Sequence, residues 1–443
     1  MIKKSSLALS FILNLFLSCQ AQVFNKAKLD SFFVALNAHN KNMGSIAISA
    51  NGALVYQNAI GSIQINGDVK TPATIKTKYR IGSISKMFTA SMIFQLIEEG
   101  KLSLTTPLAS YFPQLPNASK ITIGEMLDHR SGLHNFTNDS LYASYMGKPM
   151  SEPEMLAIFA KEKPDFEPDA KADYSNTNFV LLGYIVEKIT GKPYPEELKK
   201  HITSKIGLAD TYYGGKTNPA NNEAYSYTYG SQWKQMSETD MSVPGGAGAI
   251  VSTPADLVKF IEALFAGKLI SESSLAQMKT MKENFGMAMF IIPFNEKQGY
   301  GHNGGIDAFT SLLIYFPDDK LAVAYTSNGG NYSTNDVLIG ALSIYFNKPF
   351  AIPEFKTIAI SSADLDKYLG NYSSTQMPLK VAITKDGGTL YGQANGQGAF
   401  PLEAMGGDKF VFTAAGITVQ FDPVKHSFNL IQGGNTYLFT KNN

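Results

Sequence analysis

The chain is poor in cysteine and histidine, and each shortage removes a class of site. Its 443 residues include one cysteine and six histidines. With Cys19 as the sole cysteine, no disulfide can form within the chain. The histidines include no His-x-x-x-His pair, the spacing that sets two imidazoles on one helix face around zinc. We therefore expect no metal ion and no other cofactor.

An excess of charge of one sign is also missing. Lysine and arginine total 38, aspartate and glutamate total 37, and the formal net charge is +1. Without a long basic run, nothing in this balance favours a nucleic-acid partner. Beyond the N-terminus there is no apolar run of about 18 residues, so no internal membrane span is predicted. The hydrophobic share of 44% suffices for a large core, and the length favours two or three domains.

The first 21 residues are typical of a targeting signal. Two lysines precede an apolar stretch from Leu7 to Leu17, and small or polar residues follow. Cleavage after Ala21 would release a chain without cysteine. Alternatively, Cys19 would carry a lipid, which resembles a bacterial lipoprotein, although Phe16 stands where such signals usually have Leu. Either way we expect an exported protein of the periplasm or cell envelope, with membrane contact only through a lipid on Cys19.

The region 22–350 combines helical and strand periodicities. Apolar residues have helical spacing at 26–39 and 83–100, and they alternate at 44–56, 311–316 and 322–327. An Asn-Gly pair marks a hairpin turn within the first alternating stretch, and a Pro-Asp-Asp-Lys turn joins the last two. These patterns predict an α/β (α+β) protein in which helices pack against a mixed sheet.

The composition changes near residue 350. Prolines and serines mark 351–361 as a linker. Beyond it, in 362–443, short alternating stretches are separated by Gly-Gly and Asp-Pro turns, and roughly eight strands fit there. This pattern predicts a small antiparallel barrel or sandwich. No titratable cluster lies within it, so we expect a packing or spacer module.

Ser83 and Lys86 open the helix predicted for 83–100. At a helix start, free N–H groups and the positive end of the helix dipole face whatever is bonded to the serine. Lys86 lies three residues on and therefore on the same face. A hydroxyl, a nearby amine and an anion-stabilising helix end are the parts of a nucleophile site. Ser-x-x-Lys alone is weak evidence, because it recurs at Ser231-Gln232-Trp233-Lys234.

Two further short motifs follow along the chain. Tyr174-Ser175-Asn176 lies in a polar loop just before an apolar helix, whereas the other Tyr-x-Asn matches, at Tyr56 and Tyr345, lie inside apolar elements. Gly301-His302-Asn303-Gly304-Gly305 is predicted to be a turn that leads into a strand. Its glycines would let the backbone approach a ligand closely. Each of these motifs is weak by itself.

The ordered set Ser83-x-x-Lys86, Tyr174-x-Asn176 and His302-x-Gly304 resembles the serine β-lactamase and penicillin-binding-protein superfamily. With tyrosine in its second motif, the chain resembles the class C branch of this superfamily. That branch includes D-alanyl-D-alanine carboxypeptidases, D-aminopeptidases and esterases. The segments 129–133 and 245–257 also look like that branch. The resemblance covers about residues 25 to 347 and implies an antiparallel sheet flanked by helices, with a helical subdomain. Residues 362–443 resemble the lipocalin-like domain often attached to such proteins.

The resemblance also implies a role for each motif residue. Ser83 would be the nucleophile, and Tyr174, as a phenolate or in concert with Lys86, would be the general base. Asn176 would bond the substrate amide. The oxyanion hole would be made by the N–H groups of Ser83 and Gly305. Since lysine and tyrosine both titrate near 10 in water, each pKa must fall by about three pH units for a base at neutral pH.

The third motif departs from the family pattern. His302-Asn303-Gly304 stands where β-lactamases and carboxypeptidases have Lys-Thr-Gly, whose lysine carries a permanent charge near the substrate carboxylate. A histidine with an ordinary pKa of about 6.5 is mostly neutral at pH 7. Recognition of a carboxylate is therefore expected to be weaker.

We therefore expect an exported serine hydrolase that forms an acyl-enzyme on Ser83. Its substrates would be esters, D-amino-acid peptides or related amides, including small molecules and peptidoglycan-derived peptides. One alternative is a true class C-type β-lactamase or D-alanyl-D-alanine carboxypeptidase. An alternative of another class is an inactive cell-envelope binding or sensor protein.

Overall fold

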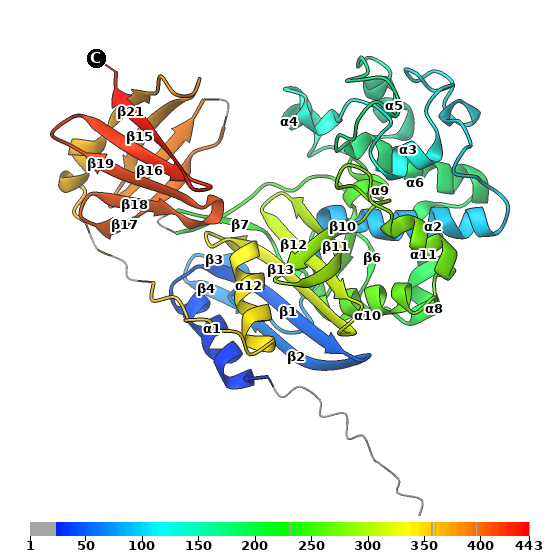
Figure 1. Cartoon of the computed structure of the whole chain (residues 1–443), viewed down its shortest axis with the longest axis horizontal. Coiled ribbons are helices and arrows are strands. Elements are labelled where there is room, and N and C mark those ends of the chain that lie inside the picture. The colour runs from blue at the N-terminus through cyan, green and yellow to red at the C-terminus, as the bar shows by residue number, and fades with distance from the viewer. Residues whose placement is uncertain (1–23, 231, 356–357, 359, 396, 443) are drawn as a thin grey trace, which may run out of the picture.

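The computed structural model describes residues 24–442 apart from 231, 356–357, 359 and 396. The predicted targeting signal, including Cys19, lies outside this range. Within it, no helix combines the length and the apolar character that crossing a membrane requires. An antiparallel sheet, a region of helices and a separate barrel are arranged as Figure 1 shows, and this confirms the predicted fold class.

The central sheet has the strand order β10-β11-β12-β13-β1-β2, with neighbouring strands antiparallel. The predicted hairpins are present as β1–β2 and β12–β13. The six strands are β1 (Asn42–Ala50), β2 (Ala53–Ile60), β10 (Phe290–Phe294), β11 (Lys297–Ile306), β12 (Phe309–Phe316) and β13 (Leu321–Gly330). Of the shorter strands, β7 (Tyr227–Tyr229) pairs with one end of the inner strand β13 and with β8 (Trp233–Gln235). Two small sheets contain β3 (Ser62–Asn66), β4 (Val69–Pro72), β5 (Tyr79–Arg80), β6 (Tyr212–Tyr213) and β9 (Ile250–Ser252).

Both faces of the central sheet are buried, and successive side chains of a strand go to different cores. On β1, Ile46 and Ile48 pack with α1 (Lys26–Ala38) and α12 (Thr334–Tyr345), while Ala47 between them faces the helical region. On β13, Val323 and Tyr325 belong to the core that contains α1 and α12, and Ala322 and Ala324 belong to the core of the helical region. This period of two is what a strand covered on both sides requires.

The helical region packs on the side of the sheet opposite α1 and α12. Its longest helices are α2 (Ser85–Glu98), α6 (Asn176–Thr190) and α10 (Pro254–Phe265). Gly100, with φ +71°, ends α2 in the left-handed conformation, as the sequence predicts. The other helices are α3 (Ile123–Leu127), α4 (Tyr142–Tyr145), α5 (Glu152–Phe159), α7 (Tyr194–Leu198), α8 (Ser204–Ile206), α9 (Gly245–Gly248) and α11 (Glu272–Lys279).

The C-terminal strands close into a barrel of eight, because β14 pairs with both β15 and β21. A barrel rather than a sandwich is therefore formed around its own apolar core. Its strands are β14 (Gly370–Ser373), β15 (Lys380–Asp386), β16 (Thr389–Ala394), β17 (Phe400–Gly406), β18 (Lys409–Phe412), β19 (Ile417–Asp422), β20 (Ser427–Gln432) and β21 (Asn435–Lys441). The lipocalin-like relationship and the domain boundaries at 350 and 362 stay predictions.

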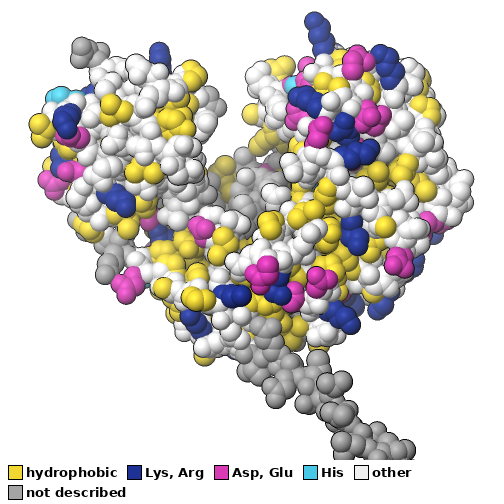
Figure 2. All heavy atoms as spheres, in the orientation of Figure 1, with side chains coloured by type: hydrophobic (Ala, Val, Ile, Leu, Met, Phe, Trp, Pro, Cys, Tyr) yellow, Lys and Arg dark blue, Asp and Glu magenta, His cyan; other side chains and the backbone are white. Residues whose placement is uncertain are grey.

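The prediction of a turn at residues 301–305 is wrong, because these residues lie inside β11. Glycines suggested a turn, but here they permit close packing of a strand. A Cβ on Gly301 would lie 1.8 Å from the Leu313 carbonyl oxygen, and one on Gly304 would lie 2.1 Å from that of Ile81. The strand can therefore approach both its neighbour β12 and the segment that precedes α2. Figure 2 shows a hollow between the barrel and the helical region, above the sheet.

Candidate active site

Ser83 lies in a 3-10 turn, Gly82–Ile84, immediately before α2 begins at Ser85. The α-helix thus starts two residues later than predicted, and Ser83 lies in the turn before it rather than in its first turn. Gly82 has φ +50°, and a Cβ there would lie 2.8 Å from the backbone nitrogen of Gly305. Only glycine fits this left-handed, crowded position. The Ser311 hydroxyl, 2.8 Å from the Ile81 carbonyl oxygen, donates to it and ties the turn to β12.

Lys86 is fully buried, and three oxygens surround its Nζ. Nζ lies 2.9 Å from Ser83 Oγ, 2.8 Å from Asn176 Oδ1 and 2.8 Å from the carbonyl oxygen of Ala247. Burial lowers the pKa of the Lys86 amine well below its ordinary value, which favours the neutral form. A neutral amine has two N–H groups, which match the amide and carbonyl oxygens. Its lone pair is then available to accept the proton of the Ser83 hydroxyl.

Tyr174 approaches Ser83 from the loop before α6. Its hydroxyl lies 2.7 Å from Ser83 Oγ and donates a hydrogen bond to it. Burial raises the pKa of Tyr174 above the ordinary tyrosine value, and the Ser83 hydrogen bond only partly offsets this. The resting tyrosine is therefore a neutral donor rather than a phenolate. Lys86 rather than Tyr174 is left as the group that can accept the Ser83 proton.

Asn176 is the first residue of α6, and protein groups fix its amide orientation. Oδ1 accepts from Lys86, while Nδ2 lies 3.2 Å from Asn135 Oδ1 and 3.1 Å from Thr137 Oγ1. Asn135 Oδ1 also accepts from the Asn176 backbone N–H at 3.0 Å. The sequence did not single out Asn135 or Thr137. The sequence gives little indication that Asn135 and Thr137 belong to the site, because short polar residues are common in loops.

His302 lies on β11 with 1% of its surface exposed. Its Nδ1 hydrogen-bonds the carbonyl oxygen of Asn303, and Nε2 has no hydrogen-bond partner among the described residues. The ring centroid is 4.7 Å from that of Phe290 and 6.3 Å from that of Tyr174. Burial is the largest effect that lowers the pKa of His302, to about 3. The imidazole therefore stays neutral far below pH 6.5, which corrects the expectation of an ordinary histidine.

The third motif also brings two backbone segments together. Gly304 packs against the Ile81 carbonyl, and Gly305, which is exposed, lies beside Gly82. The N–H groups of Ser83 and Gly305, predicted to form the oxyanion hole, thus belong to adjacent backbones. The structure therefore places Lys86 and Tyr174 at the Ser83 hydroxyl and Asn176 at Lys86 Nζ. His302, Gly304 and Gly305 lie along the neighbouring strand β11.

Ala247 contributes a carbonyl oxygen that sequence reasoning did not identify. The glycine-rich stretch around it is not only a loop, since it contains the one-turn helix α9 and strand β9. A Cβ on Gly246 would lie 2.6 Å from the Phe179 carbonyl oxygen, and one on Gly183 would lie 3.2 Å from Gly246. These glycines let α9 lie against α6, which brings the Ala247 carbonyl to Lys86. A backbone acceptor leaves no residue-type signal in a sequence.

The competing motif matches lie elsewhere. Tyr56 and Tyr345 are core residues with 2% and 6% exposure. Lys234 is exposed on the short strand β8, and its partner Ser231 lies outside the described residues. The structure thus separates the assembled motifs from the sequence matches that resemble them.

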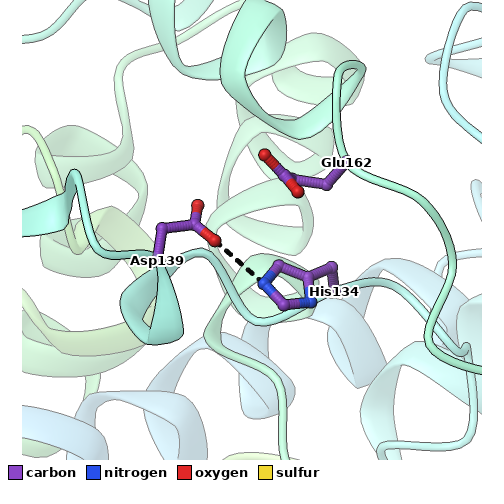
Figure 3. Close-up of side chains that lie close together, drawn as sticks. All are labelled: His134, Asp139 and Glu162. Carbon is purple, nitrogen blue, oxygen red and sulfur yellow. Dashed lines mark hydrogen bonds and ion pairs between the residues drawn. The ribbon is translucent and has the colours of Figure 1, made fainter. Parts of the chain in front are cut away.

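Figure 3 shows a histidine–carboxylate cluster. It adjoins in sequence the loop whose Asn135 and Thr137 bond Asn176. Ligand atoms of His134, Asp139 and Glu162 lie within 4.8 Å of one another. However, His134 Nε2 is 2.9 Å from Asp139 Oδ1, and Nδ1 is 2.8 Å from Asp165 Oδ1. Burial lowers the pKa of His134, but the hydrogen bonds to Asp165 and Asp139 raise it above the ordinary value overall. With both nitrogens bonded to carboxylates, the cluster is an ion network of this loop.

Comparison with known proteins identifies the family of the assembled site. The family model described as Beta-lactamase matches residues 29–341, which include all three motifs. The chain belongs to the beta-lactamase family. As a member of that family, it is a serine hydrolase.

Named members of the beta-lactamase family resemble the chain over different lengths. Penicillin-binding protein 4* of Bacillus subtilis (strain 168) is 26% identical over 93% of this chain and 98% of its own length. Teichoic acid D-alanine hydrolase of Staphylococcus aureus (strain MRSA252) is 27% identical over 64% of this chain and 70% of its own. The structure of D-amino acid amidase from Ochrobactrum anthropi SV3, with L-phenylalanine amide, matches with TM-score 0.61, 26% identity, and coverage of 72% of this chain and 99% of that chain.

Proposed function

We propose that this protein hydrolyses D-aminoacyl esters and amides through an acyl-enzyme on Ser83. The observation that carries the proposal is the environment of the Ser83 hydroxyl. It lies 2.9 Å from the buried Lys86 amine and 2.7 Å from the Tyr174 hydroxyl. A neutral amine on one side and an O–H donor on the other are the two partners that a serine nucleophile needs.

In the acylation step, Ser83 Oγ attacks the substrate carbonyl carbon and gives its proton to Lys86 Nζ. The carbonyl oxygen becomes an oxyanion, which the N–H groups of Ser83 and Gly305 stabilise. When the intermediate collapses, the bond to the leaving oxygen or nitrogen breaks. Tyr174 gives its proton to that atom, and the Lys86 ammonium restores the tyrosine. Water then hydrolyses the Ser83 ester with Lys86 as base, which returns the free serine.

The choice of substrate class rests on His302 and on the relatives. A neutral imidazole replaces the cation that β-lactamases keep in the third motif, so a substrate carboxylate gains no ion pair there. Two relatives are named as a D-amino acid amidase and a D-alanine hydrolase. An acyl group derived from a D-amino acid agrees with both observations, and a free carboxylate on the leaving side is not required.

We also propose that the protein is exported, on the evidence of the signal-like N-terminus. Cell fractionation of the full chain beside Cys19→Ala tests this part. Loss of membrane association in the variant would indicate the lipid anchor, and equal distribution of both would indicate a released protein. Recovery of the wild-type protein only in the cytoplasm would contradict export.

The substrate proposal is tested by steady-state hydrolysis of paired substrates. D-alanine and L-alanine methyl esters and amides would be compared with a chromogenic penicillin and a D-Ala-D-Ala peptide. We expect higher kcat/KM for the D-esters and D-amides than for their L-forms or for the carboxylate substrates. Preference for the penicillin or the peptide would favour the alternative β-lactamase or carboxypeptidase. No turnover of any of them by a folded protein would favour a binding role.

A further inference from the structure

His129 is a buried histidine that the proposed chemistry does not use. It follows α3, has φ +60° and is 1% exposed. A left-handed conformation is uncommon for a residue other than glycine, although histidine, asparagine and aspartate adopt it more readily than most. A conformation of this kind persists only where the surroundings hold it. At His129, the surroundings are the loop that carries Tyr174.

His129 bonds the chain on both sides of Tyr174. Its carbonyl oxygen accepts a hydrogen bond from the Asp173 N–H at 2.9 Å. Its ring Nδ1 accepts one from the Ser175 N–H at 3.1 Å. Both backbone N–H groups that flank the tyrosine are thus held by one residue. Because Nδ1 accepts, the proton of the neutral ring lies on Nε2, which has no hydrogen-bond partner among the described residues.

The His129 ring also packs against the tyrosine ring itself. The two centroids are 4.5 Å apart, with the planes inclined by 31°. Further ring contacts close an aromatic enclosure of five side chains. The remaining centroid distances are 6.3 Å for Tyr174–His302, 4.7 Å for His302–Phe290, 5.4 Å for Phe290–Phe285 and 5.4 Å for Phe285–His129. The enclosure covers one side of Tyr174 with uncharged rings.

The charged groups around this enclosure are few and mostly paired elsewhere. Lys86 and His302 are the titratable groups that influence the His129 ring, and burial lowers the pKa of His129 well below its ordinary value. The neighbours of His129 in sequence form ion pairs of their own: Asp128 with Lys282, and Arg130 with Asp169 and Glu283. The imidazole of His129 therefore stays neutral at pH 7.

We propose that His129 is the positioning residue of Tyr174. It fixes the tyrosine loop through two backbone hydrogen bonds, fixes the ring by stacking, and keeps water away from the Lys86–Tyr174 pair. This inference rests on the proposed function, since positioning Tyr174 affects the rate only if the tyrosine acts on Ser83.

Two substitutions separate the parts of this role. His129→Asn keeps a residue that tolerates φ +60° and keeps an acceptor for the Ser175 N–H, but it removes the ring. His129→Phe keeps a ring and removes the acceptor. His201→Asn is the matched control, because His201 is a partly buried histidine that contacts Gln95 and Glu197 instead.

The readout is the pH dependence of kcat/KM on an N-acetyl-D-alanine ester, which has no titratable amine of its own, with folding checked by circular dichroism. In His129→Asn, water reaches the site, so the pKa of Lys86 rises and that of Tyr174 falls. The acid limb of the pH profile then moves to higher pH and the alkaline limb moves to lower pH. We expect kcat to fall about 10- to 100-fold, the scale of a misplaced catalytic group, while KM stays within a factor of two. His129→Phe should lower kcat without moving the limbs, and His201→Asn should change neither.

The outcomes distinguish this inference from the proposed function. A wild-type protein that is not acylated would overturn the proposed function. A wild-type protein that is acylated, with a His129→Asn variant whose limbs stay in place, would overturn only the role of His129. If His129→Asn does not fold, Phe285→Ala opens the same enclosure from its exposed side. It should narrow the profile in the same way, and an unchanged profile there would also contradict the inference.

Discussion

At the scale of single residues, the proposed mechanism depends most on the protonation state of Lys86. From the sequence, the pKa of the lysine or of the tyrosine must fall by about three pH units for that residue to act as a base at neutral pH. The structure favours two neutral groups, because burial lowers the pKa of Lys86 and raises that of Tyr174. The order and spacing of the motifs predict that these residues lie close together. Their burial depends on the packing of the whole fold. The motifs alone therefore do not predict the protonation states of Lys86 and Tyr174.

The neutral Lys86 predicts a pH-dependent stability. The unfolded chain binds a proton on this lysine up to a pKa of about 10.4, whereas the native protein does not above its own, lower pKa. Because the unfolded state binds more protons, the free energy of unfolding rises with pH between these two values, by about 1.4 kcal/mol per pH unit. Urea unfolding of wild type and Lys86→Met at pH 7, 8 and 9 measures the difference. Equal slopes for the two proteins would mean that Lys86 is charged in the native state.

His302 predicts a substrate preference that does not depend on pH. With its pKa lowered to about 3, the imidazole stays neutral between pH 5 and pH 8. The kcat/KM ratio of an N-acetyl-D-alanine ester, which has no titratable amine, to a penicillin should therefore be flat over that range. His302→Lys should shift the ratio toward the penicillin by roughly 10- to 150-fold, the value of a hydrogen bond to a charged partner. A ratio that changes near pH 6.5 in wild type would contradict the lowered pKa.

At the scale of elements, regular periodicity was predictable and close packing was not. The helix at 26–38, the hairpins β1–β2 and β12–β13 and the eight barrel strands all follow from apolar spacing and turn residues. Strand β11 was missed because its glycines look like a turn. Their function is set by the distance to Ile81 and Leu313, which lie far away in the sequence. The role of the Ala247 carbonyl was not predicted for a related reason, because any residue type supplies a backbone carbonyl.

Two adjacent glycines of β11 offer a matched test of this packing. In Gly304→Ala, the new Cβ would lie 2.1 Å from the Ile81 carbonyl oxygen and 2.4 Å from Ser311 Oγ, so the Ser83 turn must move. In Gly305→Ala, the nearest neighbour is the Phe309 carbonyl oxygen at 4.0 Å. We expect Gly304→Ala to slow acylation by about 100-fold, the scale of a misplaced reacting group. Gly305→Ala should stay near wild type.

Labelling rates with a fluorophosphonate and melting temperatures would be measured for both variants. Overpacking in Gly304→Ala is also expected to cost about 1–3 kcal/mol of stability. Equal labelling of the two variants would show that the turn tolerates displacement, and the argument from close packing would fail.

At the scale of the whole molecule, an ion pair joins the barrel to the sheet region. Lys41, with 6% of its side chain exposed, forms an ion pair with Glu403 of β17. Its Nζ also lies 4.9 Å from the Phe355 ring centroid. The described contacts of Ser83, Lys86, Tyr174 and Asn176 all come from residues before the predicted linker at 351. The same is true of Gly304, Gly305 and Ser311, which lie against the Ser83 turn. The sequence predicted that the C-terminal segment contains no counterpart of the motifs, and the site is built accordingly.

A chain that ends at Pro353 is therefore expected to fold and to react at Ser83. Its labelling rate should lie within about threefold of the full chain, since additivity holds for distant sites. Stability should fall modestly, because Lys41 loses Glu403. Circular dichroism and fluorophosphonate labelling measure both. A shortened chain that is folded but cannot be labelled would show that the barrel helps to build the site.

The central claim is that Ser83 is the nucleophile, and intact-mass analysis after fluorophosphonate labelling tests it most directly. Wild type should gain one adduct, which peptide mapping places on Ser83. Ser83→Ala should gain none. Ser85→Ala is the matched control, because Ser85 lies two residues away and bonds the Ile250 N–H instead of Lys86. It should label like wild type. An adduct that persists in folded Ser83→Ala, or that maps to Ser231, would contradict the account.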